Sequence, residues 1–267
     1  MGVVNVTPDS FSDGGLWDTP DAAIVHGRVL LADGADILDI GGESTRPGAT
    51  RPLVGEEVGR VVPVIRTLAA DGARVSVDTM RSEVAEQALA AGATIVNDVS
   101  GGLADPRILD VVAASDATYV CMHWRGHSDR MQDLAAYDAP GGVVAAVREE
   151  LCVRIDAARD AGIPDERIVI DPGLGFAKKA SHNWTLLRGL SELQSLGLPL
   201  LVGASRKSFL GTLLAGPDGT PRPVDDREDA TTALTVLVAQ QRVWGIRVHD
   251  VRAARDAVRT LERWEQG

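Results

Sequence analysis

The sequence predicts an α/β protein, a single (β/α)₈ TIM barrel formed by residues 1–267, and two observations lead to this prediction. Short apolar segments rich in Val and Ile alternate along the chain with longer amphipathic segments, as in parallel sheets whose strands are connected by helices. No stretch of the chain has the composition of a linker that would divide it. A doubly wound open sheet is the alternative architecture, because it shows the same alternation.

The first strand is expected at 1–6, which is short, apolar and rich in valine. An amphipathic helix is expected at 21–33, because Asp21 suits a first helical turn and Gly34 suits a helix end. The same reasoning applied along the chain predicts the further strands 35–40, 74–77, 94–96, 118–122, 167–170, 199–202 and 245–248. It predicts the further helices 55–71, 82–91, 106–115, 142–161, 181–196, 229–242 and 250–264. The polar segment 123–140 lacks periodicity and is either a lid or an ordinary loop.

The composition restricts the class of protein. The formal net charge of −11 argues against nucleic acid or an anionic membrane as a partner, although a small anionic ligand stays possible. No apolar run approaches the length that spans a membrane. Cys121 and Cys152 lack metal-type spacing, and we interpret them as buried thiols in a reducing compartment. We therefore expect a cytoplasmic protein.

Polar side chains of a kind that is unusual in buried strands occur at or just after the ends of six predicted strands. In a barrel these positions converge on one mouth, where active sites are built. One such residue would most often be structural, but a set spread over six strands favours a site. The set consists of Asn5, Asp78, Asn97, Asp171, Lys207, Arg247 and His249.

The chemistry of these residues divides them into two groups. Asp78, Asn97 and Asp171 suit a flat heterocycle with N–H donors, such as a pterin or a purine. Arg247 and His249 suit a phosphate or diphosphate. Asn5 is a candidate for the same anion or for Mg²⁺ held partly by substrate phosphates. Lys207 could contact a ring oxygen, a phosphate or a second substrate.

Two glycine-containing loops and one polar pair add further candidates. GGESTRPG at 41–48 matches neither a P-loop nor a dinucleotide fingerprint, and we interpret it as a mobile loop over the mouth. DPGLGF at 171–176 turns tightly after a strand, and Phe176 either presents its ring to a ligand or simply packs. His123 and Arg125 follow a strand at the same end of the barrel, so a role in the site is open for both.

Five segments carry a resemblance to a known family. They are NVTPDSFSDGG at 5–15, GGESTRPG at 41–48, DPGLGF at 171–176, SRK at 205–207 and RVHDV at 247–251. In this order they resemble the dihydropteroate synthases of folate biosynthesis, in particular the actinobacterial form, and the likeness covers essentially the whole chain. The resemblance implies a barrel that joins 4-aminobenzoate to 7,8-dihydropterin-6-ylmethyl diphosphate, with Mg²⁺ as cofactor and sulfonamides as inhibitors.

The resemblance also implies a role for individual residues. The pterin pocket would consist of Asp78, Asn97, Met122, Asp171, Phe176, Gly203 and Lys207. The diphosphate would be bound by Asn5, Thr45, Arg247 and His249, with Asn5 also holding Mg²⁺. The aminobenzoate would be bound by Thr45, Arg46, Pro47, Phe176 and Ser205. The catalytic residues would be Asp13, Lys207, Arg247 and His249, and Asp13 would stabilise a pterin methyl cation formed by loss of diphosphate before amine attack.

Two other functions use part of the same pattern. A methyltetrahydrofolate–corrinoid methyltransferase would share Asp78, Asn97 and Asp171 but would not need the loop at 45–47 or the diphosphate residues. A catalytically silent pterin-binding paralogue would be expected to lose such residues, and this chain keeps them. Family resemblance suggests a homodimer. Family members usually have residues before the first strand, so either the true start lies upstream of Met1 or the bottom of the barrel is less covered.

Overall fold

A computed structural model of the chain describes residues 1–7, 19–43, 51–127 and 133–267. Within these residues, eight strands alternate with helices in chain order, as the sequence predicts. The strands are β1 Gly2–Asn5, β2 Leu38–Gly41, β3 Val75–Asp78, β4 Ile95–Asp98, β5 Thr118–Met122, β6 Ile168–Asp171, β7 Leu201–Val202 and β8 Gly245–Ile246.

The strands form a closed parallel barrel. β1 to β6 pair in chain order, and β7 pairs with β8. Two bridges close the remaining seams, because Ile170 pairs with Leu200 beside β7 and Gly2 pairs with Val248 beside β8. On the second seam the Val248 amide donates to the Met1 carbonyl at 3.0 Å. The prediction of a (β/α)₈ barrel is therefore confirmed, and the open sheet is wrong.

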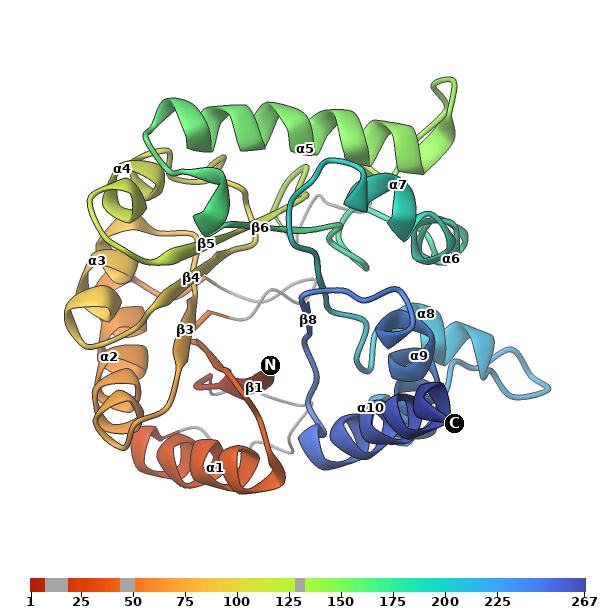
Figure 1. The fold of residues 1–267 in the computed structure, drawn as a ribbon, viewed down its shortest axis with the longest axis horizontal. Coiled ribbons are helices and arrows are strands. Elements are labelled where there is room, and N and C mark those ends of the chain that lie inside the picture. The colour runs from red at the N-terminus through yellow and green to blue at the C-terminus, as the bar shows by residue number, and fades with distance from the viewer. Residues whose placement is uncertain (8–18, 44–50, 128–132) are drawn as a thin grey trace.

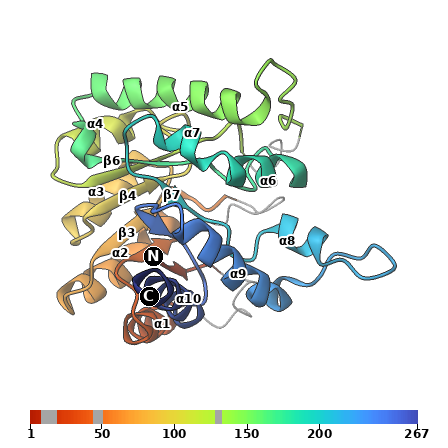
Figure 2. The same cartoon turned by 45° about the vertical axis from the view of Figure 1, so that its right-hand side comes forward.

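The helices form an outer layer around the strands (Figure 1). Neighbouring helices contact each other from α1 to α4, and α10 contacts both α9 and α1, so the layer also closes on itself. In the turned view, the light-blue segment after α8 extends away from the barrel (Figure 2). The helices are α1 Pro20–Asp33, α2 Val54–Ala70, α3 Ser82–Ala90, α4 Arg107–Ala113, α5 Gly142–Asp160, α6 Ala180–Arg188, α7 Leu190–Gln194, α8 Ser208–Leu213, α9 Glu228–Ala239 and α10 Val251–Gln266, with short 3₁₀ turns at Asp165–Arg167 and Val224–Arg227.

Local sequence explains where several helices begin and end. The Thr19 hydroxyl accepts a hydrogen bond from the Ala22 amide at 3.3 Å, and Pro20 occupies the first position of α1, where a missing N–H costs nothing. Gly34 ends α1 in the left-handed conformation, with φ of 100°. Asp250 caps α10 with its carboxylate. These signals place the helices so that consecutive strands can return to the barrel.

Some expected bounds need correction. The single helix expected at 181–196 is wrong, because the chain leaves the helix at Gly189 between α6 and α7. A Cβ atom at Gly189 would lie 2.9 Å from Cγ2 of Val144 on α5, so the glycine permits close packing there. Helix α8 was not expected, since its 6 residues are too few to show a helical period. Three strands also extend beyond their expected ends, so that they include Asp78, Asn97 and Asp171.

Two expectations drawn from the composition concern membrane-spanning segments and the cysteines. Among the described residues, no helix is long and apolar enough to cross a membrane. Cys121 is buried and Cys152 is half-buried, and both are free thiols. The expectation of thiols rather than a disulfide is confirmed, although Cys152 is less buried than expected.

Candidate active site

The register of the sheet brings predicted site residues together at the carboxyl end of the barrel. Asn5 and Asp78 pair with the same residue of β2, and Asp78 also pairs with Asn97 on β4. Met122 pairs with Asp171 between β5 and β6. Because parallel strands end on the same side, these side chains surround one mouth.

Arg247, which follows β8, lies between two carboxylates of the barrel interior. Its Nε donates to Oδ2 of Asp39 at 2.6 Å, and its Nη2 donates to Oδ2 of Asp78 at 2.7 Å. The Asn97 amide donates to the same Asp39 oxygen at 2.9 Å. Asp39 is fully buried on β2 and was missed in the sequence analysis. The signal was present, because an acidic residue interrupts the apolar run Ile37–Ile40.

Burial perturbs the charged groups at this mouth. It raises the pKa of Asp78 to about 7 against the opposing charge of Arg247, and it also raises the pKa of Asp171. Burial and the nearby Arg247 lower the pKa of Lys207 to about 8. Although burial would lower it, the pKa of Arg247 is raised by the carboxylates of Asp39 and Asp78. Perturbed groups gathered at one mouth are typical of a functional site.

An apolar wall lies beside these charges. Phe176 packs against a buried cluster that contains Met122. The Lys207 ammonium lies 4.4 Å from the centre of the Phe176 ring, within the range of a cation–π contact. A Cβ atom at Gly175 would lie 3.1 Å from Cδ of Lys207, and Gly175 has a left-handed φ of 82°, so this turn requires glycine. Phe176 thus lies beside Lys207 and against the buried cluster to which Met122 belongs.

Ser205 and His249 form the side of the mouth next to β7 and β8. The Ser205 hydroxyl lies 2.9 Å from Nδ1 of His249, and it accepts a hydrogen bond from the His249 amide at 3.2 Å. A Cβ atom at Gly203 would meet the Arg247 side chain at ordinary contact distance. The loop after β7 and the end of β8 therefore lie side by side.

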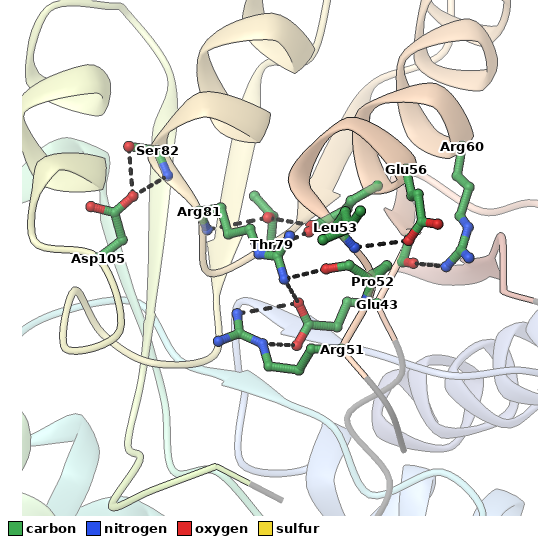
Figure 3. Close-up of polar contacts among 12 residues, drawn as sticks. Glu43, Arg51, Pro52, Leu53, Glu56, Arg60, Thr79, Arg81, Ser82 and Asp105 are labelled. Carbon is green, nitrogen blue, oxygen red and sulfur yellow. Dashed lines mark hydrogen bonds and ion pairs between the residues drawn. The ribbon is translucent and has the colours of Figure 1, made fainter.

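The described residues that flank 44–50 belong to a charged cluster on the rim of the barrel (Figure 3). Arg51 binds both carboxylate oxygens of Glu43, at 2.6 and 3.3 Å. Arg81 lies 3.4 Å from Glu43 and donates to the carbonyl of Pro52 at 2.7 Å. Arg81 also lies 3.3 Å from Glu57, a fully buried carboxylate on α2 whose pKa is raised by burial. The residues on both sides of 44–50 are thus held together by Arg81.

Four predicted site residues lie outside the described residues. They are Asp13 on the first loop and Thr45, Arg46 and Pro47 on the second. His123 and Arg125, whose role was left open, belong to a buried hydrogen-bonded cluster with Lys178, which the sequence analysis did not identify. The remaining predicted residues all lie at or beside the mouth.

Comparisons with known proteins show which family this chain is similar to. The family model of pterin binding enzymes matches residues 1–249. A dihydropteroate synthase of Mycobacterium leprae (strain TN) is 52% identical over 266 residues, which cover 99% of this chain and 92% of the relative.

Solved structures give the same result at the level of the fold. The structure of the Yersinia pestis dihydropteroate synthase with a sulfonamide drug complex is 39% identical, with a TM-score of 0.93, and covers 100% of this chain and 94% of its own. The Xanthomonas albilineans dihydropteroate synthase in complex with 7,8-dihydropteroate is 41% identical, with a TM-score of 0.85 and coverage of 100% and 93%.

Proposed function

This chain belongs to the pterin-binding enzyme family, and we propose how the mouth of its barrel performs the reaction of a dihydropteroate synthase. The chain joins 4-aminobenzoate to 7,8-dihydropterin-6-ylmethyl diphosphate and releases 7,8-dihydropteroate and diphosphate. The observation that carries this function is the 52% identity to a dihydropteroate synthase over 99% of the chain. The methyltransferase and the silent paralogue are not favoured, because the similar proteins include a dihydropteroate synthase with its product bound.

The pterin ring is proposed to bind among the buried polar groups of β3, β4 and β6. Buried carboxylates have lost hydrogen bonds to water, and the N–H donors of an amino-pyrimidinone ring would replace them. The raised pKa values of Asp78 and Asp171 record that desolvation. The apolar faces of the ring would contact Met122 and Phe176. The proposed pterin residues are Asp78, Asn97, Met122, Asp171, Phe176, Gly203 and Lys207.

The diphosphate is proposed to bind at the end of β8 and β1. Arg247 is held at this end by two carboxylates through Nε and Nη2, and its remaining N–H groups are suited to phosphate oxygens. His249, Asn5 and Thr45 complete the proposed set, although Thr45 lies outside the described residues. Arg247 and His249 would stabilise the negative charge that develops on the leaving group.

Mg²⁺ fits the donor that this end of the barrel offers. Asn5 supplies a neutral amide oxygen at the end of β1 and is half-buried. In the part of the chain that the structure describes, no group of three or more His, Cys, Asp or Glu side chains could hold a metal ion. The proposed ion is held by Asn5, water and substrate phosphates rather than by a cage of side chains. Such an ion would neutralise charge on the diphosphate.

We propose that diphosphate leaves before the amine attacks. Aminobenzoate is a poor nucleophile, whereas loss of diphosphate gives a resonance-stabilised pterin methyl cation, which Asp13 would stabilise. Positional isotope scrambling of the bridging oxygen before product forms would support this order. Replacing Asp13 with Ala should lower kcat far more than it weakens pterin binding, and equal losses would contradict the role of Asp13 at the cation.

The aminobenzoate is proposed to bind between the second loop and the end of β7. Thr45, Arg46 and Pro47 would contribute from the loop, opposite Ser205 and Phe176. The contact between Ser205 and His249 makes this second site adjacent to the proposed diphosphate site. We propose that diphosphate binding favours the loop arrangement that builds this second site, so aminobenzoate should bind more tightly once diphosphate is present.

The assembly and compartment are also proposals. We propose that residues 1–267 act as one barrel domain, since α10 contacts α1 at the seam where β8 meets β1. A homodimer is proposed from the family resemblance. A location in the cytoplasm is proposed from the free thiols, which suit a reducing compartment. Light scattering of the purified chain measures its oligomeric state directly.

The decisive experiment combines binding with turnover. Calorimetry would measure aminobenzoate binding with and without diphosphate and Mg²⁺, and a coupled assay would follow diphosphate release. Turnover, with aminobenzoate binding only when diphosphate is present, is the expected result. Pterin binding without turnover would contradict the proposed function and favour a silent paralogue.

A further inference from the structure

A buried polar cluster lies behind the proposed pterin pocket and has no role in the function described so far. We call it the Lys178 cluster, and it consists of His123, Arg125, Tyr137, Glu150 and Lys178. The side chains of Lys178 and His123 are only 3% and 1% exposed. The outer end is Glu150 on α5, which is 39% exposed. The cluster therefore extends from the helical layer to the loop that follows β6.

The hydrogen bonds of the cluster have a defined direction. Arg125 and His123 lower the pKa of Glu150 to about 2, even though burial opposes this, so Glu150 is ionised and can only accept. Glu150 lies 3.0 Å from Nε2 of His123, which must carry the proton. Burial lowers the pKa of His123 to about 4, so the ring is neutral and Nδ1 is an acceptor. Lys178 therefore donates to Nδ1, at 2.9 Å.

The same cluster fastens the turn that carries Phe176. The Lys178 ammonium donates to the carbonyl of Phe176 at 3.0 Å, and the Tyr137 hydroxyl donates to the carbonyl of Ala177 at 3.1 Å. Ala177 has φ of 48°, a left-handed conformation that costs a non-glycine residue about 1–2 kcal/mol. A strained turn of this kind persists only where its surroundings hold it, and two successive carbonyls are held here.

This turn positions the aromatic ring of Phe176 in the proposed pocket. The Phe176 ring packs against the buried cluster that contains Met122, and its centre lies 4.4 Å from the Lys207 ammonium. We propose that Lys178 is a positioning residue for the reaction, which acts through the Phe176 turn to set the affinity for the pterin substrate. His123 and Glu150 hold Lys178 in the direction that reaches this turn. The inference rests on the proposed pterin pocket.

A packing role alone does not account for Lys178. Burial disfavours its charge and lowers its pKa to about 7, and a methionine would fill a similar volume without that disadvantage. What an apolar side chain cannot supply is the pair of hydrogen bonds to Phe176 and His123. The ionisable groups that face Lys178 from neighbouring elements are His123, Arg125, Glu150, Asp171, His182 and Lys207.

The test is a double-mutant cycle on pterin binding. Lys178→Met should raise the Kd for the dihydropterin diphosphate about tenfold, measured by calorimetry without aminobenzoate. In a Phe176→Ala background the same change should have an effect of less than twofold, because Lys178 acts through that ring. Lys179→Met, at the exposed neighbouring position, is the matched control and should bind as the wild type does.

A second variant keeps the test valid if Lys178→Met folds poorly. Tyr137→Phe removes only the hydroxyl that holds the Ala177 carbonyl, and it should raise the Kd about threefold in the wild-type background and not in Phe176→Ala. Equal losses in both backgrounds, or unchanged binding in both variants, would overturn the inference. Turnover by the wild-type enzyme distinguishes the two cases. The wild type would show no turnover if the proposed function were wrong, but it would still turn over if only the inference about Lys178 were wrong.

Discussion

One arginine inside the barrel and one on its rim each lie between two carboxylates. In the interior, Arg247 binds Asp39 and Asp78 at 2.6 and 2.7 Å. Asp39 has one further hydrogen bond, from Asn97. The Asp78 carboxylate has no hydrogen bond other than that from Arg247 among the described residues. Arg247 is therefore the one hydrogen-bond donor to the Asp78 carboxylate in the part of the chain that the structure describes.

The rim centre has the same chemistry but more partners. Arg81 lies 3.3 and 3.4 Å from Glu57 and Glu43. Glu57 also accepts from the Thr79 hydroxyl at 2.6 Å, and Glu43 is bound by Arg51. Removing Arg81 would therefore leave each carboxylate with another donor. The comparison teaches that the stability lost when an arginine is removed depends on how many hydrogen-bond donors its carboxylate partners keep.

Replacement of Arg247 should have the largest effect. Arg247→Met would leave the Asp78 carboxylate without a hydrogen-bond donor among the described residues, whereas on the rim both carboxylates keep one, and we expect a loss of about 3 kcal/mol in the free energy of unfolding. Urea unfolding would measure it. Arg247→Lys keeps the charge but loses the planar guanidinium group that binds both carboxylates, so its free energy of unfolding should lie between those of the wild type and Arg247→Met. An unchanged unfolding midpoint would show that the interior is as tolerant as the rim.

Lys178 sharpens the comparison, because none of its described hydrogen bonds goes to a carboxylate. Burial lowers its pKa from the ordinary 10.5 to about 7, so between these values the unfolded chain binds more protons and stability rises with pH. From pH 7 to pH 9 the wild type should gain about 2 kcal/mol in free energy of unfolding relative to Lys178→Met. Urea unfolding of both proteins at the two pH values measures this gain. A constant difference between them would contradict the shift.

Replacement of Arg81 should have a smaller effect. Arg81→Met should cost about 1 kcal/mol in the free energy of unfolding, because Glu57 and Glu43 keep their other donors. The buried Nη1 of Arg81 also has no hydrogen-bond partner among the described residues, which reduces what the side chain contributes. The same urea experiment applies, and a loss as large as that of Arg247→Met would refute the argument from remaining donors.

Loss of a solvent-exposed ion pair should have the smallest effect on stability. Arg159 binds Asp165 at 2.7 Å on the surface, where both side chains are about half exposed. Solvent screens such pairs, so Arg159→Met should leave the thermal midpoint of unfolding unchanged. A clear decrease in that midpoint would mean that number and distance of ion pairs, rather than burial, decide stability in this protein.

Much of the fold and part of the site could be predicted from the sequence. The alternation of apolar and amphipathic segments specifies eight strands and the helices between them, because each element needs one apolar face to bury. The strand-end position of Asp78, Asn97 and Asp171 is equally local information, since a parallel barrel brings all such ends to one mouth. The break at Gly189 was not predictable, because it depends on contact with Val144.

Only the tertiary structure decided which charged groups meet. Asp39 and Arg247 are 208 positions apart and become partners because β8 closes against β1. Lys178 reaches His123 across 55 positions and fastens a turn whose strain is invisible in the sequence. The physical reason is that periodicity and turn chemistry act within a few residues, whereas the hydrogen bonds of buried charges depend on the packing that brings distant segments together.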